Sequence, residues 1–562
     1  MTRREFLQYS GGASLAFLPS GLAFPFSLPA LGQELSQLPD AFQLQPQYRV
    51  KRGIEAILRK VPAGFDAFIT ERYQDQLAAA LGHWSSQLLH SPQDMTPLAR
   101  IMSPDFSGVP LNSGQLHPVG ATSPFEVWRV EYPRDVRLAK EPFLSGLAAF
   151  FSPFSALRTA ELQIVRIHGE SLSSSGESKQ LATTVRFEIV GAGPGFHREQ
   201  RVGHWELLWE RNPSGEWRLA RWQPLDEVRS RTAVPVFRDI TAQAFGRNPS
   251  FRSQLIPGAD YWRTVLDGAT GIDIYGHHGV SVADIDGDGL DDLYVCQPAG
   301  LPNRLFHNRG DGTFEDITES AGVGVLENTA CALFADTNNN GRQDLIVVRA
   351  SGPLLFLNQG DGKFRLKPDA FQFANPPQGT FTGAAMADYD RDGWLDIYFC
   401  LYAYYQGADQ YRYPMPYFDA ENGPPNFLMR NNRDGTFRDV TKQSGLDRNN
   451  SRFSFCCAWS DYDGDLWPDL YVVNDFGRKN LYKNQGDGTF IDVAREAGVE
   501  NVGAGMSGAW VDFDNDGRMD LYVADMWTAA GLRVTAQDNF QQDAGSQARN
   551  FYKMHAMGNS LF

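Results

Sequence analysis

One acidic nine-residue pattern occurs five times in the second half of this chain, and it constrains the fold more than any other feature. The pattern is Asp-x-Asp/Asn-x-Asp/Asn-Gly-x-x-Asp, and the copies follow one another at a period near fifty residues. Each copy is followed by a β-branched and aromatic run and preceded by a shorter apolar run, so each loop is predicted to join two strands. The copies begin at Asp284, Asp336, Asp388, Asp461 and Asp512.

Each loop offers oxygen atoms at regular places. Side chains at positions 1, 3, 5 and 9 and the backbone carbonyl at position 7 can surround a hard cation, and Ca²⁺ accepts such a flexible cage more readily than Mg²⁺. The sequence therefore predicts Ca²⁺ as the cofactor, at up to five sites. The predicted metal ligands are Asp284, Asp286, Asp288, Leu290 and Asp292; Asp336, Asn338, Asn340, Arg342 and Asp344; Asp388, Asp390, Asp392, Trp394 and Asp396; Asp461, Asp463, Asp465, Trp467 and Asp469; and Asp512, Asp514, Asp516, Arg518 and Asp520.

An EF-hand is the obvious alternative for such loops. It requires a bidentate Glu at the twelfth position. The five loops instead carry strand residues at that place, namely Val295, Val347, Phe399, Val472 and Val523.

The remainder of the repeat predicts two more strands. A third apolar run follows each loop strand, and in four copies an Asp-Gly pair, typical of a tight hairpin, leads into a fourth run. Four strands per period predict β-propeller blades, because one small sheet cannot bury its faces alone. The turn pairs are Asp311-Gly312, Asp361-Gly362, Asp434-Gly435 and Asp487-Gly488.

These motifs resemble a known group. The stretch from residue 303 to residue 323, together with the loop at Asp284, is similar to the FG-GAP (VCBS-type) calcium-loop propellers of integrin α heads and of bacterial relatives of cartilage acidic protein. The resemblance covers residues 235–562 and implies a calcium-stabilised propeller used for recognition, without fixing a ligand. The ASPIC/UnbV segment of many such relatives is not found in these 562 residues.

Two loops depart from the pattern. The Asp336 loop has Asn338 and Asn340 where the others have carboxylates, and the Asp461 loop has Leu466 where the sharp turn favours Gly. Both loops are expected to bind calcium more weakly.

The charge of the chain agrees with cation binding. The net charge is −16 and the pI is near 5.1, so nucleic acid is not an expected partner. A merely solvated acidic surface is the alternative, but it does not explain the repeated spacing.

The N-terminus resembles a twin-arginine export signal. Arg3 and Arg4 precede an uncharged stretch from Gly11 to Gly32, and cleavage after Gly32 is predicted, so residues 1–32 are the signal peptide. The protein is expected to be periplasmic, secreted or at the cell surface, and not an integral membrane protein. A membrane anchor is the alternative, which the prolines and glycines of this stretch disfavour.

A different composition lies between the signal and the repeats. After a linker at 33–50, residues 51–230 are predicted to form an α+β domain: a helix from Phe65 to Leu89 is followed by strands at 162–167, 181–190, 201–209 and 217–222. This order is similar to an NTF2-like (SnoaL-like) cone. Its tryptophans are predicted to lie in the core, and His83, His168 and His204 to be surface residues rather than a catalytic set.

The five cysteines show no metal-binding or redox spacing. Because they occupy equivalent places in their repeats, they are predicted to be small buried strand residues, with a disulfide between neighbouring blades as the alternative. The residues are Cys296, Cys331, Cys400, Cys456 and Cys457.

No catalytic motif was found: there is no nucleophile elbow, phosphate loop or HExxH. The leading hypothesis is therefore a noncatalytic recognition or adhesion protein whose partner is an extracellular or cell-surface protein or glycan. The alternative is an enzyme or small-molecule carrier with its pocket in the NTF2-like domain.

Three long connections are predicted to meet on the face opposite the calcium loops, since chain direction places them there: 242–278, 401–424 and 525–558. The sequence stops inside the predicted third strand of the fifth blade. Two interpretations stay open, namely a fragment of a longer propeller and a five-bladed ring closed by residues 237–241. Aromatic and histidine side chains on the three long connections are predicted to bind the partner, and the alternative is that the aromatics only pack their own long loops. The residues are Tyr402, Tyr404, Tyr405, Tyr411, Tyr413, Tyr417, Trp527, His277 and His278.

Overall fold

The computed structural model describes residues 68–122, 124–169, 178–265, 279–404 and 413–562, and every structural statement here refers to these ranges. The predicted signal peptide (1–32) and linker (33–50) lie outside them. So do Phe65, Tyr405, Tyr411, His277 and His278.

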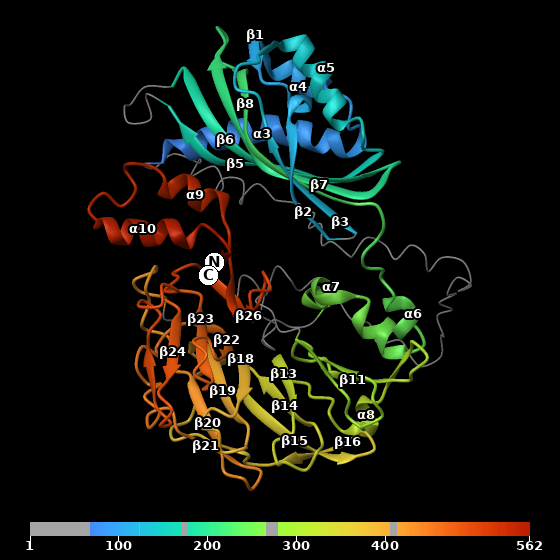
Figure 1. The fold of residues 1–562 in the computed structure, drawn as a ribbon, viewed down its shortest axis with the longest axis vertical. Coiled ribbons are helices and arrows are strands. Elements are labelled where there is room, and N and C mark those ends of the chain that lie inside the picture. Colours follow the sequence, from blue (N-terminus) through green and yellow to red (C-terminus); the bar gives the residue numbers. More distant parts are fainter. Residues whose placement is uncertain (1–67, 123, 170–177, 266–278, 405–412) are drawn as a thin grey trace, which may run out of the picture. The chain divides into compact units, whose positions relative to one another are not determined.

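The N-terminal part is an eight-stranded sheet with helices against one face (Figure 1). Its elements are α3 (Ile69–His90), α4 (Thr96–Ile101), β1 (Met102–Gly108), η1 (Leu111–Ser113), β2 (Gln115–Thr122), β3 (Phe125–Glu131), β4 (Leu138–Ala139), α5 (Lys140–Phe151), β5 (Ala156–His168), β6 (Gln180–Gly193), β7 (Phe196–Arg211) and β8 (Trp217–Thr232). The order is β2-β3-β8-β7-β6-β5, and β1 pairs with β8 and β4.

Side chains that are alternately buried and accessible along the strands explain why these residues form a sheet with one face on the core. Along β6 every second residue from Leu181 to Ile189 is buried, and α3 buries Tyr73, Leu77, Leu81, Trp84 and Leu88 at helical spacing. The predicted helix and four strands are thus confirmed, although each strand is longer than its prediction. The elements β1 to β4 and α5 were not predicted. Trp205, Trp209 and Trp222 are fully buried, as predicted for core residues.

A helical connection leads to the repeats. It contains α6 (Thr241–Phe245), a π-helix η2 (Phe251–Leu255) and α7 (Gly258–Val265). Residues 237–240, the strand that would close a five-bladed ring, form no strand in the described structure, and Phe237 is 91% exposed.

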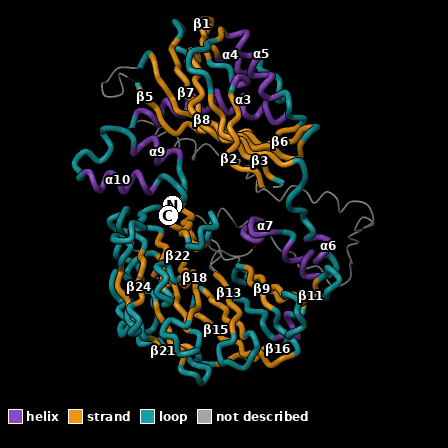
Figure 2. The backbone as a smooth tube through the Cα atoms, in the orientation of Figure 1, coloured by secondary structure: helices purple, strands orange, loops and turns teal. Residues whose placement is uncertain are grey.

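Five sheets follow, which we call units 1 to 5, with strands A to D in chain order in units 1 to 4 and strands A to C in unit 5 (Figure 2). Unit 1 is β9 (Val280–Ala283), β10 (Asp292–Val295), β11 (Arg304–Asn308) and β12 (Phe314–Asp316), followed by α8 (Thr318–Ala321). Unit 2 is β13 (Thr329–Ala335), β14 (Asp344–Arg349), β15 (Gly352–Gly360) and β16 (Lys363–Lys367).

Unit 3 is β18 (Gly379–Ala387), β19 (Asp396–Tyr404), β20 (Phe427–Asn431) and β21 (Phe437–Asp439), and β17 (Phe371–Gln372) lies parallel beside β21. Unit 4 is β22 (Ser454–Ser460), β23 (Asp469–Asn474), β24 (Asn480–Asn484) and β25 (Phe490–Asp492). Unit 5 is β26 (Gly505–Val511), β27 (Asp520–Asp525) and β28 (Ser560–Leu561), with α9 (Ala529–Thr535) and α10 (Ser546–His555) before β28.

Successive units share their hydrophobic cores. One cluster joins Tyr294 of unit 1 to Val347 of unit 2, and further clusters join units 2 and 3, 3 and 4, and 4 and 5. Because each core is built from two units, a single four-stranded sheet could not bury its apolar faces alone. Within the described units, strands A to D are antiparallel neighbours, so the A–B and C–D turns lie at the same end of each sheet.

The cysteines lie in or beside these strands. Cys296, Cys400 and Cys457 are buried, whereas Cys331 and Cys456 are half-buried, and all five are free thiols. The prediction of buried strand residues is therefore confirmed for Cys400 and Cys457, whereas Cys296 is buried directly after the end of β10, and the alternative of a disulfide is not observed.

Candidate metal centre

The first aspartate of each loop folds the loop around itself. In unit 1, Asp284 Oδ1 accepts the backbone N–H groups of Gly287 (2.7 Å) and Asp288 (3.1 Å), and Oδ2 accepts that of Gly289 (2.9 Å). The N–H bond from Gly289 is the main reason that the pKa of Asp284 is lowered. Equivalent bonds to residues four and five positions further recur at Asp336, Asp388, Asp461 and Asp512.

The ninth position is the buried end of the cage. Asp292, Asp344, Asp396 and Asp469 are almost fully buried at the start of strand B. Burial raises the pKa of Asp396 to about 8 and that of Asp469 to about 6. A divalent cation beside these carboxylates would favour their ionised form, so the site chemistry fits a bound cation.

Four loops bring their carboxylates together. The groups whose oxygen atoms lie within 4.8 Å of one another are Asp284, Asp286 and Asp288; Asp388, Asp390 and Asp396; Asp461, Asp463 and Asp465; and Asp512, Asp514 and Asp520. Within the described residues, the Asp336 loop forms no such group.

Buried oxygen atoms without partners also fit a cation. Asp390 Oδ1, Asp396 Oδ2 and Asn338 Oδ1 have no hydrogen-bond donor among the described residues. Leaving a buried carboxylate oxygen unpaired is costly, and a hard cation would satisfy it. In each unit, the aspartate at position 9 would bind the cation from the start of strand B, and positions 1, 3, 5 and 7 would bind it from the loop. The position 9 residues are Asp292, Asp344, Asp396, Asp469 and Asp520.

The two divergent loops differ from the others in identifiable ways. Asn338 Nδ2 donates to Asp344 Oδ2 (3.1 Å), so the amide already uses the ninth carboxylate of its loop. Leu466 has φ of +72°, in the left-handed region where the other four loops have Gly289, Gly341, Gly393 and Gly517.

Strand C contributes an asparagine that the sequence analysis missed. Asn358 Nδ2 donates to Ile285 O of the preceding unit's loop (2.8 Å). Asn431 likewise donates to Thr337 O, and Asn484 to Tyr389 O, both at 2.8 Å. Each loop of units 1 to 3 is therefore tied to the unit after it. The signal was available, because an Asn follows each third apolar run.

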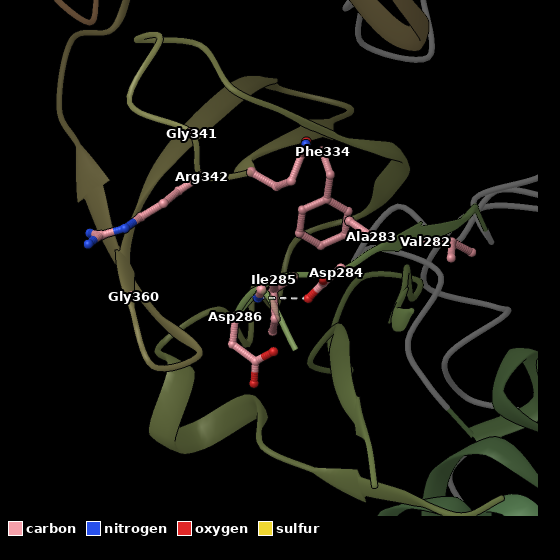
Figure 3. Close-up of a pocket in the computed structure, with 11 residues that line it drawn as sticks. Val282, Ala283, Asp284, Ile285, Asp286, Phe334, Gly341, Arg342 and Gly360 are labelled. Carbon is pink, nitrogen blue, oxygen red and sulfur yellow. Dashed lines mark hydrogen bonds between the residues drawn. The ribbon is translucent and has the colours of Figure 1, made fainter. Parts of the chain in front are cut away.

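A surface pocket of about 430 Å³ lies between the loops of units 1 and 2 (Figure 3). Asp284, Asp286 and Arg342 line it beside the ring of Phe334. It adjoins the first predicted metal site, and its charged groups of both signs make it a polar recess.

The opposite ends of the sheets carry the long connections. Tyr402 and Tyr404 belong to β19, so the unit 3 insertion begins later than the predicted residue 401. Tyr417 stacks on Tyr552 of α10 (6.4 Å between ring centroids) and contacts His555 (4.9 Å). The insertions of units 3 and 5 thus pack against each other, while Tyr413 remains 73% exposed.

The N-terminal sheet buries a charged network. Arg201 donates to Glu199 Oε1 (2.7 Å) and to Phe150 O (2.7 Å), and Arg229 donates to Glu227 Oε1 (2.8 Å). Tyr132 donates to Glu227 as well. Of the predicted surface histidines, His83 and His168 are exposed, and His204 pairs with Asp226 (3.0 Å) at half-exposed positions.

Comparison with known proteins identifies the repeats. Residues 284–347, 336–399 and 461–523 match the FG-GAP-like repeat family. The chain is 36% identical over 132 residues to cartilage acidic protein 1 of Xenopus tropicalis and 37% identical over 135 residues to that of Homo sapiens. Each match covers 23% of this chain, and the chain spans only 20% of these curated relatives' length.

Solved structures are similar only in part. An Agrocybe aegerita lectin that recognises non-reducing terminal N-acetylglucosamine is 21% identical, with a TM-score of 0.27, over 44% of this chain and 63% of the lectin. A putative dehydratase of the NTF2-like family from Streptomyces avermitilis is 14% identical, with a TM-score of 0.17, over 27% of this chain and 95% of that protein. TM-scores this low carry no argument about the fold.

Among the described helices, none combines the length and apolar character needed to cross a membrane. The residues that match the repeat family include the aspartate loops of all five units and the start of the strand that follows each loop. Residues 284–399 and 461–523 of this chain match the FG-GAP-like repeat family, and the chain has partial sequence similarity to cartilage acidic protein 1.

Proposed function

We propose that this protein is an exported, noncatalytic β-propeller that binds calcium and acts in recognition or adhesion, with an extracellular protein or glycan as its partner. The observation that supports this most is the recurrence of one oxygen-rich loop at the A–B turn of five units, with carboxylates gathered in four of them. Calcium at these turns would fix the loops on one end of every sheet and leave the other end for a partner.

Calcium binding is tested directly on the full chain. The purified protein is analysed for bound metal, and its melting temperature is measured with calcium and after chelation. Stabilisation requires that the folded loops bind the ion and the unfolded chain does not. No bound calcium together with an unchanged melting curve would overturn the proposal.

Recognition is tested on a glycan array and on extracellular matrix proteins, with calcium and with chelator. Replacing the exposed Tyr413 and Met415 by Ser should remove binding while calcium-dependent stability persists. A matched control replaces Phe513 and Met519 by Ser, since both are exposed in the loop of unit 5. If only the control variant loses binding, the partner lies on the calcium face.

Export is tested by replacing Arg3 and Arg4 with Lys, because the receptor of the twin-arginine pathway reads the paired guanidinium groups. The precursor should then remain in the cytoplasm. Unchanged processing would remove this part of the proposal.

A second candidate function is a small-molecule carrier or enzyme in the N-terminal sheet. It is favoured by the indole N–H groups of Trp84, Trp205 and Trp222, which are buried without an acceptor among the described residues. A ligand with hydrogen-bond acceptors would satisfy them. The test is a screen of such compounds on the full chain, with tryptophan fluorescence as the readout. Trp205→Phe, which removes one of the three donors, should weaken the binding of any compound found.

A further inference from the structure

One position of strand C differs from unit to unit in a way that concerns the loops directly. It is the residue immediately before Asn308, Asn358, Asn431 or Asn484, and in units 1, 3 and 4 its side chain contacts the loop of its own unit. The residues there are His307, Leu357, Arg430 and Lys483 in units 1 to 4.

In unit 4 this side chain bridges the predicted metal ligands. Lys483 Nζ contacts Asp463, at loop position 3, and lies 3.4 Å from Asp465 Oδ2, at position 5. The lysine side chain is 30% exposed, so it reaches the loop from solvent and can leave it.

Unit 3 repeats the arrangement with a different cation. Arg430 Nη2 lies 2.5 Å from Asp390 Oδ2 and 3.0 Å from Asp392 Oδ2, again loop positions 3 and 5. Arg433 adds a second contact to Asp392 (2.8 Å). Unit 2 has Leu357 at this position, and in unit 1 the ring of His307 lies 3.0 Å from Asp292 Oδ1 and 3.5 Å from Asp286 Oδ2.

We infer that Lys483 and Arg430 are tethered cations that occupy the loops of units 4 and 3, so that calcium binds there only by displacing them. This inference rests on the proposed calcium binding. A divalent ion held by positions 3 and 5 and a charged side chain on the same oxygen atoms repel each other, because the separation is only a few ångströms. The loops of units 3 and 4 therefore fill at higher calcium concentrations than they would without Arg430 and Lys483.

The tethered cations would give the loops of units 3 and 4 different states at low and at high calcium. At low calcium the tethered cation neutralises part of the carboxylate cluster and keeps the unit folded. At high calcium the side chain is released to the surface at the same end of the sheets, which changes the charge of that surface. The molecule would thereby respond to calcium in two stages.

Binding to these two loops can be measured with terbium as a probe in place of calcium. A nearby tryptophan sensitises terbium emission, so the emission reports an ion bound close to that tryptophan. Loop position 7 is Trp467 in unit 4 and Trp394 in unit 3, whereas the other loops have Leu290, Arg342 and Arg518. In a Trp394→Phe background, the emission that Trp467→Phe removes belongs to unit 4.

The decisive variant is Lys483→Met, which keeps the aliphatic stem and removes the charge. It should lower the half-saturating terbium concentration of unit 4 about tenfold. Lys483→Arg keeps the charge and should not. Lys363→Met, an equal change of net charge at an exposed place in β16, should leave this concentration unchanged.

The results separate this inference from the calcium proposal. Terbium binding that is unchanged in Lys483→Met, or shifted equally in Lys363→Met, overturns the inference while calcium binding stands. A parent protein that binds neither terbium nor calcium overturns both. If Lys483→Met does not fold, Arg430→Met in a Trp467→Phe background, read through Trp394, makes the same test in unit 3.

Discussion

Lys479 Nζ lies 2.8 Å from Asp525 Oδ1, and both side chains are fully buried. Lys479 belongs to unit 4 and Asp525 ends strand B of unit 5, so the pair joins two units. Lys479 also donates to Gly503 O (2.9 Å), and Asn501 donates to Asp525 Oδ2 (2.9 Å). Units 1 and 3 have the uncharged residues Asn303 and Asn426 at the place of Lys479. Each also reaches the next unit, since Asn303 Nδ2 donates to Thr329 Oγ1 (2.9 Å) and Asn426 Nδ2 donates to Ser454 Oγ (2.9 Å).

Removing one partner should therefore be costly. Lys479→Met leaves a buried carboxylate without its cation and should lower the free energy of unfolding by about 3–5 kcal/mol. Urea unfolding measures this loss. The double variant Lys479→Met with Asp525→Asn should recover most of it, and a single variant as stable as the parent would contradict the interpretation.

The tie between units can be tested on adjacent residues. Asn358 is buried and donates to Ile285 O, whereas Gln359 is exposed on the same strand. Asn358→Ala leaves a buried carbonyl unpaired and should cost about 2 kcal/mol. Gln359→Ala is the control and should change the melting temperature little; equal effects would mean that the tie is unimportant.

Calcium should stabilise the protein, and the loop of unit 2, which has the fewest carboxylates, should contribute least. A site at a hundred times its dissociation constant adds about 2.7 kcal/mol, so chelation should lower the melting temperature. Asp388→Ala should reduce the calcium-dependent part of this shift more than Asn338→Ala, because the loop of unit 3 has more carboxylates than the loop of unit 2. The opposite order, measured by calorimetry, would argue against the assigned ligands.

The left-handed residue of unit 4 predicts a stabilising substitution. Leu466 has φ of +72° and is 69% exposed, so little packing is lost on its removal. Leu466→Gly should raise the free energy of unfolding by about 1 kcal/mol and tighten calcium binding in that loop. Gly393→Ala is the reciprocal test, since a Cβ there meets no atom within 4 Å. It should destabilise by a similar amount through backbone strain alone.

Asp475 predicts a pH dependence of stability. Burial raises its pKa to about 6, and Tyr402 donates to Oδ2 at 2.7 Å. Because the folded pKa exceeds that of the unfolded chain, its contribution to stability is fully present below pH 4 and is lost as the pH rises through 6. Asp475→Asn should remove this loss. The variant should gain about 2 kcal/mol relative to the parent between pH 4 and 7, as measured by urea unfolding. A difference that does not change with pH would contradict this assignment.

The repeat was predictable from sequence because it is written in local signals. The nine-residue loop, the strand-forming runs and the Asp-Gly turns each act over a few residues, so strands A to D appear where expected. The N-terminal strands were underestimated, because Arg201 and Glu227 interrupt the apolar pattern yet are buried as ion pairs. The helices α9 and α10 were missed because they lie inside a connection between strands.

The sequence by itself determined the five aspartate loops and the end of each sheet on which they lie, since chain direction fixes the latter; the metal ligands within the loops stay a prediction. Only the tertiary structure decided which residues from other strands meet those loops. Asn358 reaches Ile285 across 73 positions, and Lys483 reaches Asp463 across 20. Such partners are chosen by the register between strands and by the packing of one unit on the next. A local pattern carries no record of either.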